Sequence, residues 1–170
     1  MRILGIDPGL DITGYGVVDS RGDDLFVVEA GIIKSSNKSK LPLRLKTIYS
    51  QLSDLILAVK PDVCAVEQLY SHYKHPMTSI LMGHARGVVL FSCSQVGVEI
   101  IDYPAKTVKR SITGNGNASK LQVKMVVEGI LGIKENDFPV DVTDALALCI
   151  TYARHNIVNP LVHLRGVQRG

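Results

Sequence analysis

Four acidic residues stand where carboxylates from distant parts of the chain could meet. Asp7 closes a short apolar run at the N-terminus, and Glu67 closes a second apolar run that begins at Asp62. Asp141 and Asp144 are three residues apart at the start of a predicted helix, so both lie on one helix face. At an effective dielectric of about 20, two carboxylates about 4 Å apart repel by roughly 4 kcal/mol. If the four acids converge, they must therefore share protons or bind a cation.

The chemistry of such a cluster favours a hard divalent cation. Ligands that are all oxygen atoms suit Mg²⁺ or Mn²⁺ better than zinc. Two ions about 4 Å apart could bridge a scissile phosphate, one activating water and the other stabilising the leaving 3′ oxygen. We therefore expect two Mg²⁺ per subunit, with Mn²⁺ able to substitute.

Each acid also has a simpler local interpretation. Asp7 precedes Pro8-Gly9 and suits a turn, while Glu67 could mark only the point where a strand reaches water. Asp141 could serve as a helix N-cap, with Asp144 favoured by the positive end of the helix dipole. These alternatives remain open for each residue taken alone, and the metal-site hypothesis depends on all four meeting.

Basic and aromatic residues gather in three stretches of the chain, at 70–75, 103–127 and 145–170. The segment 103–127 contains five cations and no acid, and 145–170 contains three arginines and no acid. Such segregation is typical of a surface for a phosphate backbone, although a solvated basic surface is an equal alternative. Lys109 and Lys120 could neutralise charge that develops on a phosphate. The tyrosines could instead belong to a polar surface loop, and the lysines could be solvated helix residues. The expected DNA contacts are Tyr70, Tyr73, Lys74, Lys106, Lys109, Arg110, Lys120 and Lys124.

Hydrophobic periodicity predicts the order βββ-α-β-α-β-α-α-α. This order favours an α/β fold with a mixed five-stranded sheet, three antiparallel strands followed by two parallel ones, and helices on both faces. We expect one domain over 1–155 and a tail over 156–170 with no clear period. The expected strands are 2–7, 13–19, 25–34, 62–67 and 98–102, and the expected helices begin near 41, 77, 104, 120 and 141.

Composition restricts the class of protein. The chain has 170 residues, 46% of them hydrophobic, and a formal net charge of only +3, which alone argues little for nucleic acid. The three cysteines are far apart and suit a reducing compartment. The chain shows neither a secretory signal nor a membrane span, so a cytoplasmic location is expected. A mean hydropathy of +0.18 fits a generous core or a buried subunit interface, and we favour a mixture of the two with a dimer. Gly83 and Gly87 would let a second helix approach there, unless they pack on the protein's own sheet.

In combination, these motifs resemble the RuvC family of Holliday-junction resolvases. The resemblance covers nearly the whole chain except the tail. It is carried by GIDPGLDITGYGVV at 5–18, AVEQLY at 65–70, GHARGV at 83–88, YPAKTVKRSITGNGNASKLQV at 103–123 and DVTDALALCIT at 141–151.

The resemblance implies an RNase H-like fold, a homodimer, and paired symmetrical nicks across a four-way DNA junction in recombination and repair. By motif position it makes Asp7, Glu67, Asp141 and Asp144 the metal-binding catalytic acids. It places Lys109 and Lys120 near the scissile phosphate, and Tyr70 where the family has a base-probing aromatic. It also suggests a branch-migration complex with RuvA and RuvB as partners.

Three other functions remain as alternatives. The segment Gly5–Gly9, with Gly14 and Gly16, also resembles the first phosphate loop of actin-like ATPases and sugar kinases, although those proteins need two domains and about twice this length. The second alternative is a nuclease of the same fold that acts on RNA. The third is a protein that binds junctions without cutting them.

Overall fold

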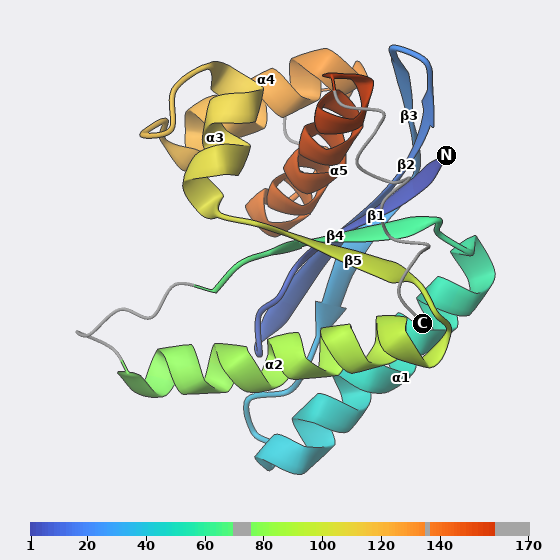
Figure 1. Ribbon diagram of the computed structural model, residues 1–170. Helices are drawn as coiled ribbons and strands as arrows, with labels where there is room; N and C mark the ends of the chain where they lie inside the picture. The colour runs from blue at the N-terminus through green and yellow to red at the C-terminus, as the bar shows by residue number, and fades with distance from the viewer. Residues whose placement is uncertain (70–75, 135–136, 159–170) are drawn as a thin grey trace, which may run out of the picture.

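The computed structural model describes residues 1–69, 76–134 and 137–158. It forms three layers, with one sheet between two groups of helices (Figure 1). The elements are β1 (Arg2–Asp7), β2 (Ile12–Arg21), β3 (Asp24–Lys34), α1 (Leu41–Val59), β4 (Val63–Glu67), α2 (Pro76–Gln95), β5 (Glu99–Tyr103), α3 (Ala105–Thr113), α4 (Lys120–Leu131) and α5 (Val140–Val158).

The sheet has the strand order β3-β2-β1-β4-β5. Strands β1, β2 and β3 form an antiparallel meander, and β4 and β5 run parallel to β1 and to each other. The predicted mixed sheet of three antiparallel and two parallel strands is therefore confirmed. Strand β1 is central, and residues on both its faces, such as Ile3 and Leu4, are fully buried. That burial accounts for the nearly continuous apolar run in its sequence.

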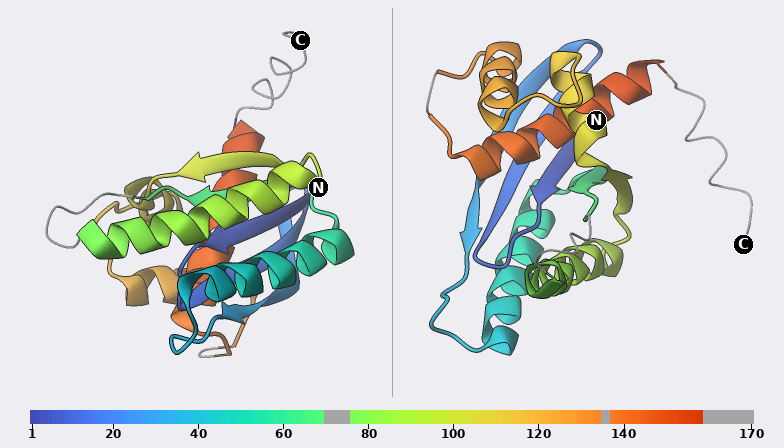
Figure 2. Two further views of the ribbon diagram at one scale, coloured as in Figure 1. Left: turned by 90° about the horizontal axis from the view of Figure 1, so that it is seen from below. Right: turned by 90° about the vertical axis from the view of Figure 1, so that its left-hand side faces the viewer.

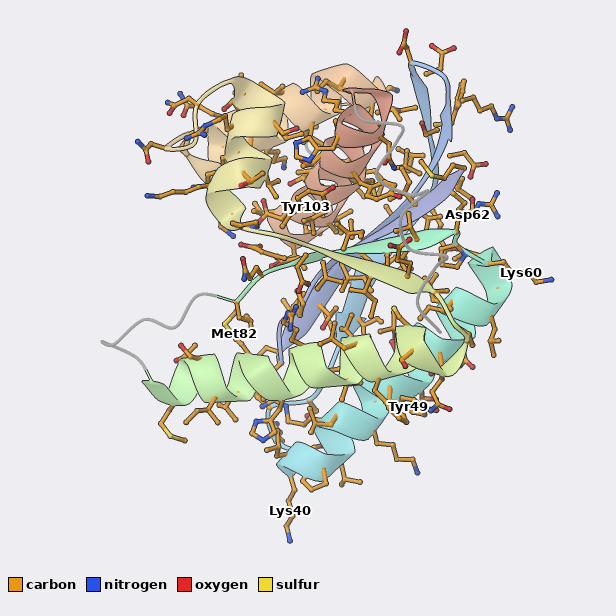
Figure 3. The ribbon with its side chains drawn as sticks, in the orientation of Figure 1. Lys40, Tyr49, Lys60, Asp62, Met82 and Tyr103 are labelled. Atoms are coloured by element: carbon orange, nitrogen blue, oxygen red, sulfur yellow. The ribbon has the colours of Figure 1, made fainter. Side chains whose placement is uncertain are left out.

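Helices cover both faces of the sheet. Helices α1 and α2 lie on one face, and α3, α4 and α5 lie on the other (Figure 2). Because side chains alternate along a strand, β1 divides its residues between two cores. Ile3 belongs to the core beneath α5, whereas Leu4 and Ile6 belong to the core beneath α1 and α2. Tyr103, at the end of β5, lies beneath the α3–α5 layer (Figure 3).

Helix α5 packs unusually close to the central strands. A Cβ added to Gly5 would lie 2.1 Å from the carbonyl oxygen of Ala145 and 2.8 Å from the Cys149 sulfur. Only glycine leaves room for the helix backbone at this distance. The Cys149 thiol donates to the Gly16 carbonyl at 3.3 Å, which adds a polar contact between helix and sheet. The first turn of α5 is thus brought down to the strand ends.

Most predicted boundaries hold within one or two residues. Helix α1 has the predicted limits, and the residues flanking it, Lys40 and Lys60, are marked in Figure 3. Helix α5 is longer than expected, because it continues to Val158. Asp141 lies inside its first turn, and the Pro139 carbonyl accepts the first helical hydrogen bonds, so the alternative of Asp141 as N-cap is wrong.

Candidate metal and nuclease site

Asp7 and Glu67 lie side by side at the same edge of the sheet. Strands β1 and β4 are parallel neighbours, and Ile6 pairs with Val66 one residue before each acid. Both acids end their strands. On β1 and β4 the alternating pattern places them on the face that packs against α5, the same face as Gly5 and Ala65. The acids thus come together because two parallel strands end in register.

Helix α5 brings the remaining two acids to this edge. Asp141 lies over Gly14, the residue that pairs with Asp7 across β1 and β2. A Cβ on Gly14 would lie 2.1 Å from the Asp141 carbonyl oxygen and 3.1 Å from its Cβ. Asp144, one turn later, is close enough to raise the pKa values of both Asp7 and Glu67. All four predicted acids therefore stand around one end of the sheet.

Crowding and burial favour the protonated forms of two of these acids. Burial is the largest cause that raises the pKa of Asp7 to about 7, and repulsion from Glu67 and Asp144 adds to it. Burial and repulsion from Asp144 also raise the pKa of Glu67, while its hydrogen bond with Asp7 acts in the opposite direction. Both effects of the shared hydrogen bond correspond to a proton held on Asp7, whose carboxyl would then donate to Glu67.

Two lysines face the acids from the neighbouring helices. The Lys120 ammonium donates to Asp144 Oδ2 at 2.8 Å, and this bond is the main cause that raises the lysine's pKa. Lys109 of α3 lowers the pKa of Glu67 by its charge. Lys109 and Lys120, together with Glu67 and Asp144, line a cavity of about 60 Å³ whose floor is apolar. Both predicted lysines therefore lie at the acid site.

The donor atoms fit a hard divalent cation, because they are carboxylate oxygens held in a partly desolvated place. As they stand, the residues that the structure describes contain no group of three or more His, Cys, Asp or Glu side chains arranged to hold a metal ion. Asp144 is instead paired with Lys120, and Asp7 shares a hydrogen bond with Glu67. Binding of a cation would therefore require the carboxyls to turn and the Lys120–Asp144 pair to open.

The other predicted DNA contacts divide into two groups. Lys106 and Arg110 are exposed on α3, beside the loop that contains Gly116. Lys124 is only 9% exposed, and its ammonium donates to the Phe138 carbonyl oxygen at 3.1 Å. The assignment of Lys124 as a DNA contact is therefore wrong, because its charge is turned into the protein.

Two further predictions concern other parts of the surface. Tyr70, Tyr73 and Lys74 lie outside the described residues. Gly83 and Gly87 point away from the sheet, and a Cβ at either position would meet no atom within 4 Å. The alternative that these glycines pack against the protein's own sheet is therefore wrong.

Gly14 lets the first turn of α5 approach Asp7, and it was not predicted from the sequence as part of the site. Its signal was the glycine-rich stretch at 14–16, which was interpreted only as part of a strand or a phosphate loop. Once β1 and β2 are paired, Gly14 falls opposite Asp7 and Gly16 opposite Gly5. Glycines paired with a strand that ends in an acid could have indicated that a helix backbone passes close to that strand.

Fold and site together define an RNase H-like protein with an acidic nuclease-type centre. The family model described as "Crossover junction endodeoxyribonuclease RuvC" matches residues 3–152, and the chain belongs to this RuvC family. The RuvC protein of Rhodopirellula baltica is 44% identical over 159 residues, which are 92% of this chain and 89% of that one. The RuvC protein of Caldicellulosiruptor saccharolyticus is 41% identical and covers 89% of this chain and 92% of its own length.

Two solved structures of junction resolvases are similar to this chain. The Thermus thermophilus RuvC structure in complex with a Holliday junction substrate superimposes with a TM-score of 0.87 at 31% identity, covering 94% of this chain and 96% of that one. The yeast mitochondrial Holliday junction resolvase Ydc2 has a TM-score of 0.59 at 16% identity and covers 89% of this chain and 78% of its own, which supports the fold alone.

Proposed function

We propose that this protein resolves four-way DNA junctions by paired symmetrical nicks in recombination and repair. The observation that carries the proposal is the meeting of Asp7, Glu67 and Asp144 from two strands and a helix, with Lys109 and Lys120 beside them. Membership of a family of crossover junction endonucleases supports both the reaction and the substrate. It also favours DNA cleavage over the ATPase, the RNA nuclease and the non-cutting junction binder.

RuvC proteins are metal-dependent nucleases, and we propose two Mg²⁺ per subunit here, with Mn²⁺ as a substitute. Asp7, Glu67, Asp141 and Asp144 would hold the ions. When bound, such cations supply an activated water and stabilise the leaving 3′ oxygen. The raised pKa values of Asp7 and Glu67 support the proposal, because buried carboxylates that repel one another gain most from a cation.

The protein's own groups would then bind and orient the phosphodiester. Lys109 and Lys120 would offset negative charge on the scissile phosphate, since both ammonium groups border the acids. Lys106 and Arg110 would contact neighbouring phosphates from the exposed side of α3. Tyr70, with Tyr73 and Lys74, would contact bases and phosphates near the crossover.

A homodimer is the second part of the proposal, because a near two-fold junction presents two equivalent phosphates. Helix α2 presents an apolar groove of about 510 Å³, open to the surface and lined by Ile80, Gly83, Gly87 and Phe91 among others. Ile80 and Phe91 are 51% and 53% exposed, respectively. A symmetric contact between two such helices would cover them. We expect Gly87→Arg to give a monomer in light scattering, whereas Lys46→Met on the exposed side of α1 should leave the dimer intact.

The cellular setting completes the proposal. No helix in the described part of the chain has the length and apolarity to cross a membrane. We propose a cytoplasmic location and cooperation with the branch-migration proteins RuvA and RuvB. A pull-down with each purified protein, in the presence and absence of junction DNA, would test the partners.

Cleavage of a synthetic four-way DNA junction, mapped on all four strands, tests the function. We expect one nick in each of two opposite strands, at symmetrical positions, and only when Mg²⁺ or Mn²⁺ is added. The matched substrates are a linear duplex and a four-way RNA junction of the same sequence. Intact junctions with bound protein, or equal cleavage of the RNA, would each refute the proposed activity.

A further inference from the structure

We propose that Lys124 is a positioning residue that sets the first turn of α5 and thereby orients Asp141 and Asp144 for metal binding. This inference rests on the proposed function, because it treats the two aspartates as metal ligands. It assigns a role to a lysine whose charge does not reach the surface. The residue acts through backbone and touches neither DNA nor the reacting atoms.

The position of Lys124 on α4 makes this role possible. Helix α4 starts with a capping box between Ser119 and Gln122, which fixes the register of its first turn. Lys120 and Lys124 are four residues apart and share one helix face. Lys120 reaches the Asp144 carboxylate directly, whereas Lys124 reaches the chain just before α5. One face of α4 therefore contacts both α5 and the segment that leads into it.

Lys124 binds a backbone oxygen at the point where the direction of α5 is set. Its ammonium donates to the Phe138 carbonyl oxygen at 3.1 Å. That carbonyl belongs to the peptide bond with Pro139, which has no N–H and so offers only this one polar atom. The Pro139 carbonyl then accepts from the amides of Val142 and Thr143, the first hydrogen bonds of α5. Rotation of the Phe138–Pro139 peptide would therefore turn the helix start.

The contact between the Lys124 ammonium and the Phe138 carbonyl is buried, so water cannot readily take the place of the ammonium. Lys124 is 9% exposed and Glu128, one turn later, is 5% exposed. The Glu128 carboxylate lies 3.7 Å from the lysine ammonium and balances its charge. A buried cation that is paired and also hydrogen-bonded to backbone fixes one geometry. Groups that orient metal ligands in this way typically change metal affinity about 10- to 100-fold when removed.

The test separates a role in positioning from a role in holding the fold together. Lys124→Met with Glu128→Leu removes both charges and so leaves no unpaired buried ion. We expect this double variant to fold, to bind a four-way junction in EDTA within about twofold of the unaltered protein, and to need roughly 10-fold more Mg²⁺ for half-maximal cleavage. Without DNA, the rise in Tm on adding Mn²⁺ should weaken in parallel.

Three further variants serve as controls. Lys124→Arg keeps a donor for the Phe138 carbonyl and should retain the normal Mg²⁺ requirement. Lys46→Met removes an exposed lysine far from the site and should change nothing. If the first double variant does not fold, Lys124→Met with Glu128→Gln, which keeps a polar group at 128 but no donor at 124, carries the same measurement.

An unchanged Mg²⁺ requirement together with a lower Tm would overturn the inference, because Lys124 would then support only the fold. Failure of both double variants to fold would count against it in the same way. The Mn²⁺-induced rise in Tm needs no substrate. If the unaltered protein cut no junction, the proposed function would fail, while this readout would still decide the role of Lys124.

Discussion

Replacement of Asp7 by asparagine should stabilise the metal-free protein while abolishing cleavage. The folded state raises the pKa of Asp7 from 3.8 to about 7, because the carboxyl is buried and repelled by Glu67 and Asp144. An asparagine amide resembles the protonated carboxyl, since it is uncharged and can donate to Glu67. The substitution therefore removes an electrostatic cost without removing the hydrogen bond.

The magnitude follows from linkage. A folded pKa above the unfolded value means that the folded state holds the proton more tightly than the unfolded state does. The free energy of unfolding that the bound proton contributes is therefore present below about pH 4 and is lost by about pH 7. The full difference corresponds to about 4 kcal/mol. Because Glu67 shares the repulsion and can relax, we expect the variant to gain about 2 kcal/mol at pH 8 and almost nothing at pH 4.

Urea unfolding followed by circular dichroism, in EDTA at several pH values, measures this gain. The control is Asp23→Asn, which changes an exposed acid in the β2–β3 turn and should leave the free energy of unfolding unchanged. The Asp7→Asn variant should still bind a four-way junction, because the basic surfaces are intact, but should not cut it. Equal or lower stability of this variant at pH 8, or retained nicking, would refute the reasoning.

Three further predictions concern the supports of the site. Gly14→Ala should destabilise the protein by at least about 2 kcal/mol in urea unfolding, because its Cβ would lie 2.1 Å from the Asp141 carbonyl oxygen. The control Gly129→Ala, at an open helical position, should instead stabilise the protein by about 0.5–1 kcal/mol. Equal effects of the two substitutions would contradict the close approach of α5 to Gly14. Ser119→Ala should cost about 1 kcal/mol through loss of the capping box, and an unchanged urea midpoint would show that the cap contributes nothing. Lys120→Met should lower the single-turnover cleavage rate about 100-fold or more with little change in junction affinity, and a normal rate would exclude a role at the phosphate.

The fold could be predicted from the sequence because its elements have strong local signals. The 19 residues of α1 show apolar spacing of three and four, with Pro42 in the first turn and Pro61 just beyond the end. The run Arg2–Asp7 and the Pro8-Gly9 turn that follows it likewise predicted a buried strand. Boundaries failed only where the chain carried no stop signal, as at the end of α5.

The acids of the site were predictable, but their electrostatic state was not. Asp7 and Glu67 were expected to meet because each ends a strand, and parallel pairing brings them together. The raised pKa of Asp7 depends first on burial of its carboxyl, which no local sequence pattern reports. Lys124 shows the same limit, since it was grouped with surface cations although its stem turns inward toward Phe138. Whether a lysine faces solvent is decided by the packing of α4 on α5 rather than by charge spacing.

The central claim is that carboxylates from β1, β4 and α5 bind divalent cations at one site. A crystal structure of the protein grown with Mn²⁺, with anomalous scattering recorded, tests this most directly. We predict anomalous peaks bounded by the carboxylates of Asp7, Glu67 and Asp144, with ligand oxygens at about 2.1 Å and the Lys120 ammonium moved away from Asp144. Peaks found only elsewhere, with Lys120 still paired to Asp144, would contradict the account.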